Sequence, residues 1–457
     1  MSGTLRYSMT IGSLVLVMLL SYPGAADNTT GQLQKDKEKN TSLRTSLPDG
    51  PLTIEKALEI AFANNPDIIA GGWDIRAAQA RTEQATSRHW PTVELNAAYR
   101  HHWHEERLVP ARGQSSDASF SSDIFSGDVV LSIPLFEGGR AVSSVDASRF
   151  LKKAAEQGLE QTREELVFNI KSTFYAILGQ DRLVNAVEYS IKALEQHLGK
   201  TEELLSVQKA ARVDLLNIEV RLADLRYQLV RECGISDMYR RLLVNLMGID
   251  TIPHGGFDVS GDLSIYDAST DSEELILKAV RERPDMARLD AEIKAQKERI
   301  DIAWAEYWPV VSAKGTYGAR ASVQGDYDDL GFAGIELSFP FFTGLETAAR
   351  VDEEEAELRI LEEKKRKLAL DIGREIDSAV IRTKTALARI DATAKAIAMA
   401  RESLDIASEK AAVGHGTTMD VLDAQAALLK AETMRFTALT DLHTACALLD
   451  LASGGAS

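Results

Sequence analysis

Two carboxylates near the C-terminal end of the chain have the residue types and spacing of a ligand-binding pair. Asp420 and Asp423 are three positions apart, so both lie on one face of a helix that follows the break at Val413-Gly414. Carboxylates held close together favour cations and resist anions. Thr417 precedes Asp420 by three residues, as in a capping box, and an acid in a first helical turn is stabilised by about 0.3 to 1 kcal/mol. The pair is therefore either a cation-binding site or a pair of helix-cap residues.

A second cluster, residues 101–106, reads His-His-Trp-His-Glu-Glu. His102 and His104 share one face of a strand, and imidazoles with carboxylates can hold Zn, Cu or Ni. A loop that ends a strand explains the same residues without a metal, and we predict no metal site. The sequence lacks an H-E-x-x-H motif, a Gly-rich phosphate loop and a nucleophile elbow. Cys233 and Cys446 stand alone, as buried free thiols do. We therefore predict neither an enzyme nor a cofactor.

Short strands with alternating apolar residues lead into long helices, and this arrangement occurs twice. The alternating residues are Val129, Leu131, Ile133 and Leu135 in the first copy and Ile335, Leu337, Phe339 and Phe341 in the second. Each strand ends in a P-x-F-x-G-like junction, formed by Pro134, Phe136 and Gly138 and by Pro340, Phe342 and Gly344. We predict strands at about 92–103, 125–136, 309–320 and 332–342. Apolar and polar residues on opposite faces suit a barrel wall between lipid and water.

The helix that follows the first junction, about residues 141–205, carries a heptad seam. Its apolar positions are Ile170, Ile177, Val184, Ile191, Leu198 and Leu205, with Val187 and Leu194 between them. At 1.5 Å per residue, a helix of some 65 residues is roughly 100 Å long, about three times the hydrocarbon thickness of a bilayer. It carries many charges, so it must stand in water against other helices. An opening helix at about 53–89 is interrupted at Asn65-Pro66, and its counterpart, from about Ser272, is interrupted before Pro284.

Regular offsets show that the chain is an internal duplication. Pro66 and Pro284, Trp90 and Trp308, and Tyr99 and Tyr317 are each 218 residues apart. After the first strand the offset becomes 206, as for Pro134 and Pro340, Asp214 and Asp420, and Gly248 and Gly454. The 12-residue difference predicts a longer loop within residues 100–128. We therefore predict one repeat at 51–250, a linker at 251–271 and a second repeat at 272–457.

Residues 1–26 predict a signal peptide. Arg6 precedes an apolar run from Ile11 to Leu20, and small residues follow at Gly24-Ala25-Ala26. The run is short for a spanning helix, although an uncleaved anchor is the alternative. Residues 27–50 are polar and predict a flexible lead-in. The chain is therefore expected to be exported.

Composition excludes two classes of protein. With 457 residues, 45% hydrophobic and 26% charged, the chain has enough apolar content for a core, which excludes wholesale disorder. The formal net charge of −17 argues against nucleic acid as a partner.

Four strands cannot close a barrel alone, and lipid forbids open sheet edges, so copies must pool their strands. An eight-stranded barrel is filled by its own side chains, so a conducting pore needs three or more copies.

Taken together, these features resemble the outer-membrane efflux proteins, the TolC-type channels. The resemblance rests on the duplication, the two strand-to-helix junctions, the Trp-Pro strand starts and the segment 413–424, which is similar to the family's periplasmic tip motif. It implies a mainly α fold with a membrane β-barrel portion, in which a homotrimer forms a 12-stranded barrel and long α-helical coiled-coil hairpins form a periplasmic tunnel. It also implies an outer-membrane location, a periplasmic adaptor and an inner-membrane pump of the RND or ABC type.

The resemblance also assigns roles to residues. Asp420 and Asp423 would lie on the tunnel side of the entrance, as acidic rings that gate it. The adaptor-docking tip would comprise Val413, Gly414, Thr417, Thr418, Val421 and Leu422. Ala411 and Gly416 stand where the family has a Tyr and an Arg that help to close the entrance, so that latch is missing. The first-half tip, residues 208–216, lacks the Val-Gly step.

Trp90 and Trp308 stand where helix gives way to strand. They suit either an interfacial aromatic girdle or packing at a helix end.

The sequence as a whole predicts a passive exit duct for a tripartite efflux pump or a type I secretion system, carrying small molecules or secreted protein across the outer membrane. A non-conducting periplasmic coiled-coil adaptor is the alternative, although adaptors lack two strand pairs placed symmetrically between helices.

Overall fold

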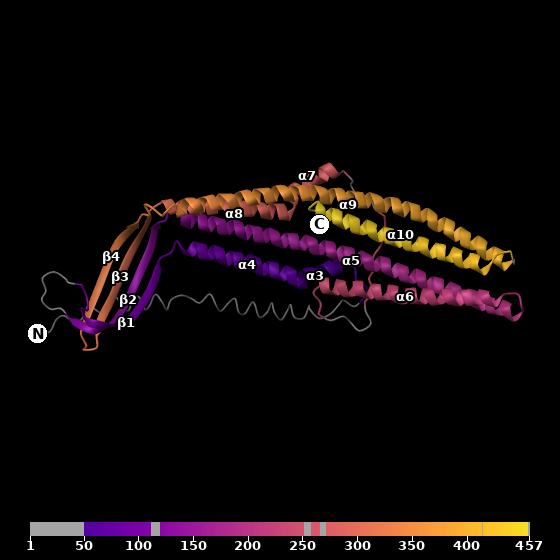
Figure 1. Ribbon diagram of the computed structural model, residues 1–457, viewed down its shortest axis with the longest axis horizontal. Coiled ribbons are helices and arrows are strands. Elements are labelled where there is room, and N and C mark those ends of the chain that lie inside the picture. The colour runs from indigo at the N-terminus through magenta and orange to yellow at the C-terminus, as the bar shows by residue number, and fades with distance from the viewer. Residues whose placement is uncertain (1–49, 111–118, 251–256, 266–270, 414, 456–457) are drawn as a thin grey trace.

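The computed structural model describes residues 50–110, 119–250, 257–265, 271–413 and 415–455. The predicted signal peptide, the lead-in up to residue 49, Gly414 and most of the 251–271 linker lie outside the described residues. Figure 1 shows an elongated molecule with a β-sheet at one end and long paired helices that run to the opposite end. In the part of the chain that is described, no helix is both long and apolar enough to cross a membrane.

The helices of the two repeats match in length. Helices α3 (Ile54–Asn64) and α7 (Ser272–Glu282) have 11 residues each, α5 (Arg140–Ser206) and α9 (Glu346–Ala412) have 67, and α6 (Arg212–Leu246) and α10 (Thr418–Ala452) have 35. Helices α4 (Pro66–Ser87) and α8 (Pro284–Trp304) have 22 and 21. The 3-10 turn η1 (Ala305–Tyr307) follows α8. The starts of the helices thus keep the predicted offsets of 218 and 206.

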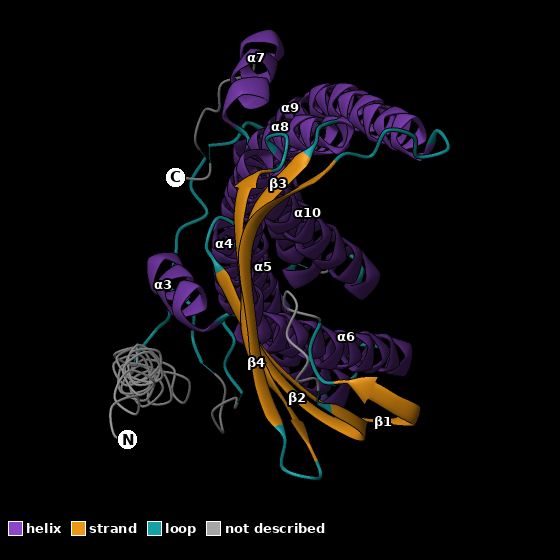
Figure 2. Cartoon of the chain, turned by 90° about the vertical axis from the view of Figure 1, so that its left-hand side faces the viewer, coloured by secondary structure: helices purple, strands orange, loops and turns teal. Residues whose placement is uncertain are grey.

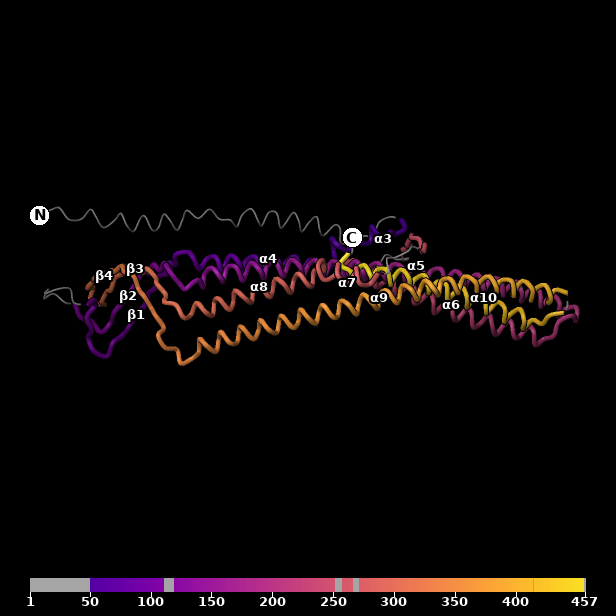
Figure 3. Tube along the Cα trace, turned by 90° about the horizontal axis from the view of Figure 1, so that it is seen from above, coloured from indigo at the N-terminus to yellow at the C-terminus, as the bar shows by residue number. Residues whose placement is uncertain are grey.

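Helices α5 and α9, with 67 residues each, run the length of the rod, whereas α6 and α10, with 35, cover about half of it and α4 and α8 a shorter part (Figure 1). Helices α4 and α8 pack beside them near the sheet, and α6 and α10 return from the distal tips. The distal half is a layer in the order α6, α5, α10, α9. Helices α3 and α7 lie near the middle of the rod, where α3 packs against the end of α6 and α7 against the end of α10 (Figures 1 and 3).

The predicted heptad seam forms the core between the helices. Ile170, Ile177, Val187, Ile191 and Leu194 are buried, whereas Val184, Leu198 and Leu205 are half-buried. Towards the tips, the seam packs against α6 and α10 through Ile218, Leu222, Leu422 and Leu429. Burial of this apolar stripe holds the two hairpins of one chain together.

The two cysteines differ in burial. Cys446 on α10 is buried and is not part of a disulfide, as expected. Cys233 is not part of a disulfide either, but it is exposed, so the expectation of burial is wrong there. The reason is its place on α6, an outer helix of the layer, which has a neighbour on one side only.

The sheet has four antiparallel strands in sequence order: β1 (Thr92–Arg107), β2 (Phe120–Phe136), β3 (Val310–Ser322) and β4 (Tyr327–Ser338). It curves across the end of the helical layer (Figure 2). The predicted fourth strand, 332–342, is wrong at its end. Strand β4 stops at Ser338, so Pro340, Phe342 and Gly344 follow it, because proline has no N–H for the ladder. In the first repeat Pro134 lies within β2, next to a register irregularity between Pro134 and Phe136.

Candidate functional site: the sheet faces, the junctions and the helix tips

The sheet has one apolar face and one largely polar face. The strand register aligns Leu95 with Val129, Val129 with Tyr317, and Ala313 with Ile335, so these side chains share a face. Leu95 and Ile335 are 78% and 74% exposed, so this apolar face is uncovered in the single chain. The lipid-facing residues that the sequence suggested, Val129, Leu131, Ile133, Ile335 and Leu337, all share it. Phe339 lies one residue beyond β4.

The opposite face carries ion pairs between neighbouring strands. Lys314 Nζ lies 2.8 Å from Glu336 Oε2, and an Arg320 guanidinium nitrogen lies 2.7 Å from Asp128 Oδ1. Ser132 and Ser338 have the same parity as these residues. A surface that is apolar on one side and charged on the other separates an apolar solvent from water.

Each strand-to-helix junction turns through residues with positive φ. In the first repeat, Gly138 and Gly139 have φ of 64° and 91°. A Cβ on Gly138 would come within 2.6 Å of Trp308 Cβ and 2.7 Å of the Ala305 carbonyl oxygen, so only glycine fits there. In the second repeat, Gly344 has φ of 67° and Leu345 has φ of 71°. Leu345 thus occupies the left-handed region where the first repeat has Gly139.

Trp90 and Trp308 lie at this end of the sheet and are 68% and 57% exposed. The Trp308 Cβ and Cγ atoms lie close to Gly138, although more than half of the residue is exposed. The same end exposes further large apolar side chains, namely Leu135, Phe136, Phe339, Phe341 and Phe342. Both tryptophans thus belong to an exposed aromatic and apolar band, and their role as an interfacial girdle stays a prediction.

The tip of the second repeat is closed by a complete capping box, which confirms the capping prediction for Asp420. Asp420 N–H donates to Thr417 Oγ1 at 3.1 Å, and Thr417 N–H donates to Asp420 Oδ2 at 2.9 Å. The Thr417 hydroxyl also donates to Asp420 Oδ2, at 2.8 Å. Hydrogen bonds from the backbone and side chain of Thr417 hold the pKa of the Asp420 carboxyl below its usual range. Asp423 is exposed, and no hydrogen bond or ion pair to another described residue engages its carboxylate.

The candidate docking residues divide by burial. Val413 is 70% exposed, Thr417 is exposed and Thr418 is half-buried. Val421 and Leu422 are buried, and Leu422 packs in the core cluster between the hairpins. In this structure the latter two hold the tip together and do not present a surface.

The two positions of the missing latch also lie at this tip. A Cβ on Gly416 would lie 2.9 Å from the Ala411 backbone nitrogen. An arginine at position 416 would therefore displace the end of α9. The close approach of the backbone at this position therefore favours glycine.

The His-rich segment lies at the end of the sheet that is far from the helices. His101 Nδ1 lies 2.7 Å from Asp123 Oδ1, and His102 Nδ1 lies 3.2 Å from Glu106 Oε1. The bulge between His101 and Glu106 removes residues 102–105 from the ladder. Among the described residues, no three His, Cys, Asp or Glu side chains converge in a way that would hold a metal ion.

Sequence reasoning missed a pair of contacts at the middle of the rod, where α3 meets α4 and α7 meets α8. Asn65 Nδ2 donates to the Leu246 carbonyl oxygen at 2.9 Å, and an Arg283 guanidinium nitrogen donates to the Ala452 carbonyl oxygen at 3.2 Å. Both carbonyl groups lie at the end of a returning helix, and they are related by the 206-residue offset. The only local signal is the polar residue that precedes each proline.

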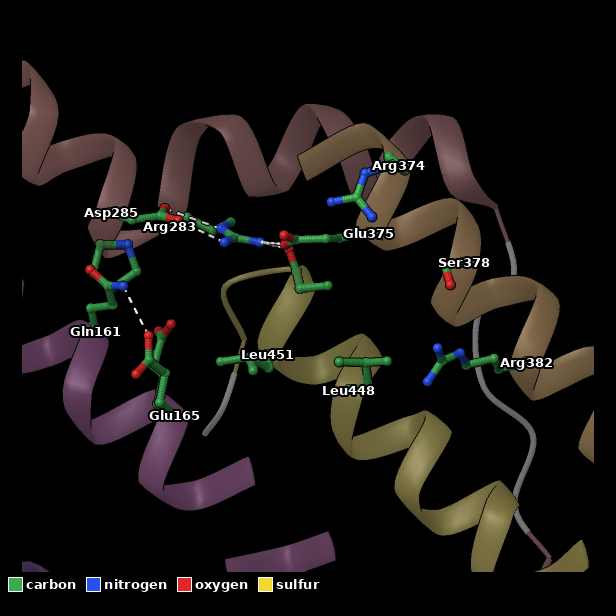
Figure 4. Close-up of a pocket in the computed structure, with 13 residues that line it drawn as sticks. Gln161, Glu165, Arg283, Asp285, Arg374, Glu375, Ser378, Arg382, Leu448 and Leu451 are labelled. Atoms are coloured by element: carbon green, nitrogen blue, oxygen red, sulfur yellow. Dashed lines mark hydrogen bonds and ion pairs between the residues drawn. The ribbon is translucent and has the colours of Figure 1, made fainter. Parts of the chain in front are cut away.

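Arg283 also borders a cavity of about 420 Å³ between α5, α9 and the end of α10. Figure 4 shows its guanidinium between Asp285, at 2.6 Å, and Glu375, at 2.9 Å. Glu164 lines the α5 wall, and burial raises the pKa of its carboxyl to about 6 even though Arg283 opposes the shift. The cavity therefore combines a paired arginine with a carboxylate that is poorly compensated.

Comparison with known proteins shows which family the chain resembles. It matches the outer membrane efflux protein family over residues 57–233 and 275–455. It is 20% identical over 293 residues to the cobalt-zinc-cadmium resistance protein CzcC of Cupriavidus metallidurans, covering 64% of each chain. It is 24% identical over 198 residues to the outer membrane protein TolC of Escherichia coli, covering 41% of this chain and 40% of that one. The aligned part is thus less than two thirds of either relative.

The fold is similar to the Campylobacter jejuni CmeC outer membrane channel, with a TM-score of 0.76 at 18% identity over 88% of this chain and 85% of that one. A duplicated chain with two strand hairpins and four long helices, and with a sheet that is apolar on one face, defines the outer-membrane channel class. The chain belongs to the outer membrane efflux protein family.

Proposed function

We propose that this chain is the outer-membrane exit duct of a tripartite efflux pump or a type I secretion system. Three copies would form a passive pore through which small molecules or secreted protein leave the cell. The duct would present its sheet to outer-membrane lipid and its helices to the periplasm. An adaptor and an inner-membrane pump of the RND or ABC type would supply substrate and energy.

The main support for this proposal comes from the sheet. Its uncovered face is apolar, its other face is charged, and within the described chain the outer edges of β1 and β4 have no strand partner. Unpaired edges are not tolerated in lipid, so strands of other copies must complete the ladder. Two copies would give eight strands, whose interior is filled by side chains, whereas three give twelve and leave a lumen.

The helical rod supports the same conclusion. At 1.5 Å per residue, 67 residues extend roughly 100 Å. The two outer helices of the distal layer, α6 and α9, expose apolar side chains such as Tyr227, at 71%, and Met399, at 71%. Such stripes on charged helices indicate further helix partners.

At the distal tips, Asp423 is the better candidate for a selective ring. Its carboxylate is exposed and free, whereas the carboxylate of Asp420 is engaged by Thr417. One Asp423 from each copy would favour cations at the entrance. Asp420 would contribute charge there as well as capping the start of α10. Adaptor docking at this tip would use Val413, Thr417 and Thr418, which are at least partly accessible.

The test is to purify the protein from outer membranes and record its conductance in planar bilayers. The matched variants are Val129→Arg and Val130→Arg, neighbours on opposite faces near the middle of β2. Arginine on the lipid face costs about 2 to 4 kcal/mol at the bilayer midplane, so Val129→Arg should abolish assembly. Val130→Arg should assemble and conduct. Equal damage from both, or a protein without conductance, would contradict the proposal.

Selectivity is tested with the same recordings. Asp423→Asn should weaken cation preference more than Asp420→Asn does, because the Asp420 carboxylate is already hydrogen-bonded. Unchanged selectivity in the double variant would place the filter elsewhere. Scoring drug, metal and secreted-protein phenotypes together in a deletion strain would identify the cargo.

A further inference from the structure

The junction between β2 and α5 contains a cavity of about 310 Å³ that has no part in the proposed conduction path. Its walls come from the end of α4, through Arg88 and His89, and from residues 134–142. Pockets that hold small ligands start at about 300 Å³. In the proposed duct this junction lies where the barrel meets the helical rod, at the periplasmic surface of the membrane. What can bind there therefore rests on the proposed function.

One side of the cavity is apolar and is continuous with the apolar face of the sheet. Phe136 lies opposite Val311 in the strand register, and Val311 lies opposite Leu337, so Phe136 belongs to that face. Phe136, Leu135 and Val142 all line the cavity, and all three are exposed. A lipid whose acyl chains lie along the apolar face of the sheet would therefore have its headgroup beside this cavity.

The polar part of the cavity carries charges of both signs that are not paired with each other. Arg88 is permanently positive, and His89 adds a ring N–H donor. Glu137, from the segment between β2 and α5, supplies a carboxylate. No hydrogen bond or ion pair to another described residue engages these three side chains. They are therefore free to bind a ligand that itself carries both charges.

The second junction lacks this arrangement. Glu306 and Thr343 stand at the positions that correspond to Arg88 and Glu137 under the offsets of 218 and 206. The Glu306 carboxylate is paired with the Arg350 guanidinium. The charge at the second junction is thus satisfied within the chain, whereas the charges at the first junction are not.

A cation at the end of α4 also has a structural explanation, because the helix dipole favours positive charge at a helix C-terminus. The second repeat, however, has the acid Glu306 at the corresponding place, so the fold does not require a cation there. The dipole also does not explain why Arg88 and Glu137 line one cavity without pairing. A bound ligand explains both observations.

We propose that this cavity binds the headgroup of a zwitterionic phospholipid that carries a primary ammonium, such as phosphatidylethanolamine. Arg88 and His89 donate to the phosphate, and Glu137 accepts from the ammonium. Charge-assisted hydrogen bonds of this kind are stronger than neutral ones. The acyl chains lie along Phe136 and the apolar face of the sheet. The bound lipid joins the end of α4 to the start of α5 and fixes the depth at which each copy lies in the membrane.

Other phosphate-containing molecules match the cavity less well. Phosphatidylglycerol offers a phosphate but no cation for Glu137, and its net negative charge is repelled by that carboxylate. Phosphatidylcholine carries a cation, but its quaternary ammonium has no N–H to donate. Inorganic phosphate lacks both the ammonium and the acyl chains.

Lipid selectivity is the first test. The full-length protein, purified in detergent and stripped of lipid, is titrated with phosphatidylethanolamine, phosphatidylglycerol and phosphatidylcholine that have identical acyl chains. Native mass spectrometry measures the bound lipid. The wild type should bind phosphatidylethanolamine at least about tenfold more tightly than the other two, because one charge-assisted hydrogen bond changes affinity by about that factor. Equal affinity for the three lipids, or equally effective competition by inorganic phosphate, would overturn the proposal.

Two variants separate the two charges. Arg88→Gln should lower the affinity for phosphatidylethanolamine and phosphatidylglycerol alike, by about tenfold, because both use the phosphate donor. Glu137→Gln should lower only the affinity for phosphatidylethanolamine and so abolish the preference, which general damage to the fold would not do. Arg149→Gln, which removes an exposed arginine about two turns further along α5, is the matched control and should bind lipid as the wild type does.

The outcomes also separate this site from the duct. If Arg88→Gln or Glu137→Gln binds all three lipids as the wild type does, the proposed site is wrong, and a protein that still conducts in planar bilayers leaves the duct proposal intact. A protein that conducts but binds no lipid selectively likewise overturns the site alone. A protein that neither fractionates with the outer membrane nor conducts overturns both.

Discussion

The two distal tips have the same backbone plan but different local chemistry. In the first, Lys209 N–H donates to the Leu204 carbonyl oxygen at 2.8 Å, and in the second, His415 N–H donates to the Lys410 carbonyl oxygen at 2.9 Å. These bonds are equivalent under the 206-residue offset and end α5 and α9 in the same manner. The duplication has therefore preserved the hydrogen bonds that end the helices.

The start of the returning helix differs. Thr417 supplies a side-chain acceptor and forms a complete capping box, whereas its counterpart, Ala211, has only a backbone N–H, which donates to Asp214 Oδ2 at 3.1 Å. The first tip also places Gln208 at φ of 62°, a strained conformation for a residue other than glycine. The start of the returning helix is thus fully capped at the second tip and only partly capped at the first.

At the middle of the rod the two repeats differ in another way. Both keep the same contact, but they use different side chains to make it. Asn65 and Arg283 each donate to the carbonyl group at the end of a returning helix. The two repeats thus share the carbonyl acceptor and the position of the contact, whereas the donor side chain is neutral in the first repeat and charged in the second.

The largest expected effect is at this position. Arg283→Ala should cost about 3 to 5 kcal/mol, because it leaves the largely buried Asp285 carboxylate without its partner. Asn65→Ala removes only neutral hydrogen bonds and should cost about 1 to 2 kcal/mol. The measurement is the free energy of unfolding in detergent. Equal losses would show that charge does not distinguish the two contacts.

The capping difference predicts a smaller effect. Thr417→Ala should destabilise the start of α10 by about 0.5 to 2 kcal/mol, and Ala211→Thr should stabilise the start of α6 within a similar range. Amide hydrogen exchange at Asp420 and Asp214 measures both locally. Since the Asp420 pKa is depressed, its acceptor role is complete above the ordinary carboxyl pKa and is lost as pH falls through the depressed value. The Thr417→Ala effect should therefore be constant near neutral pH. A change between pH 6 and 8 would contradict this account.

Glu164 offers a comparison between the two long helices, since its counterpart on α9 is Leu370, which is 70% exposed. The Glu164 pKa, raised to about 6, means that the folded state holds its proton more tightly, so stability falls as pH rises from about 4.5 to 6. Glu164→Gln should remove this slope and raise stability at pH 7 by about 1 kcal/mol or less, given the solvent screening of a half-buried group. Urea unfolding of both proteins across pH 4 to 8 is the measurement. A wild type without this slope would contradict the burial argument.

The smallest effect concerns Gln208. Gln208→Gly removes a left-handed strain of about 1 to 2 kcal/mol but adds chain entropy to the unfolded state, so a net gain below about 1 kcal/mol is expected. Val207→Gly, at a residue with φ of −101°, is the control and should destabilise. Thermal unfolding that ranks the two variants in the opposite order would contradict the strain assignment.

Periodicity and duplication made most of the fold predictable. The predicted long helix, 141–205, differs from α5 by one residue at each end. Strand β4 was misjudged because Phe339 and Phe341 continue the alternation, although Pro340 between them cannot join the ladder.

The sequence showed less of the site. Asn65 and Arg283 bond to carbonyl groups 181 and 169 residues away, and a carbonyl acceptor has no sequence signature. The burial of Leu422 depends on Val187 and Leu194 of the other repeat, so the tip motif alone did not distinguish packing from docking. The sequence left two alternative roles open for Asp420, and the capping box shows that it caps the helix.

The open edges of β1 and β4 also bear on how the protein is made. In the proposed duct, each copy before assembly carries two strand edges that have no partner among the described residues, beside an exposed apolar face, the combination that promotes aggregation in water. Such a subunit is protected only by contact with its own kind or by a holding factor. The yield of assembled protein is therefore expected to depend on how quickly copies meet after export. Slow delivery to the membrane should leave more of the protein aggregated than rapid delivery does.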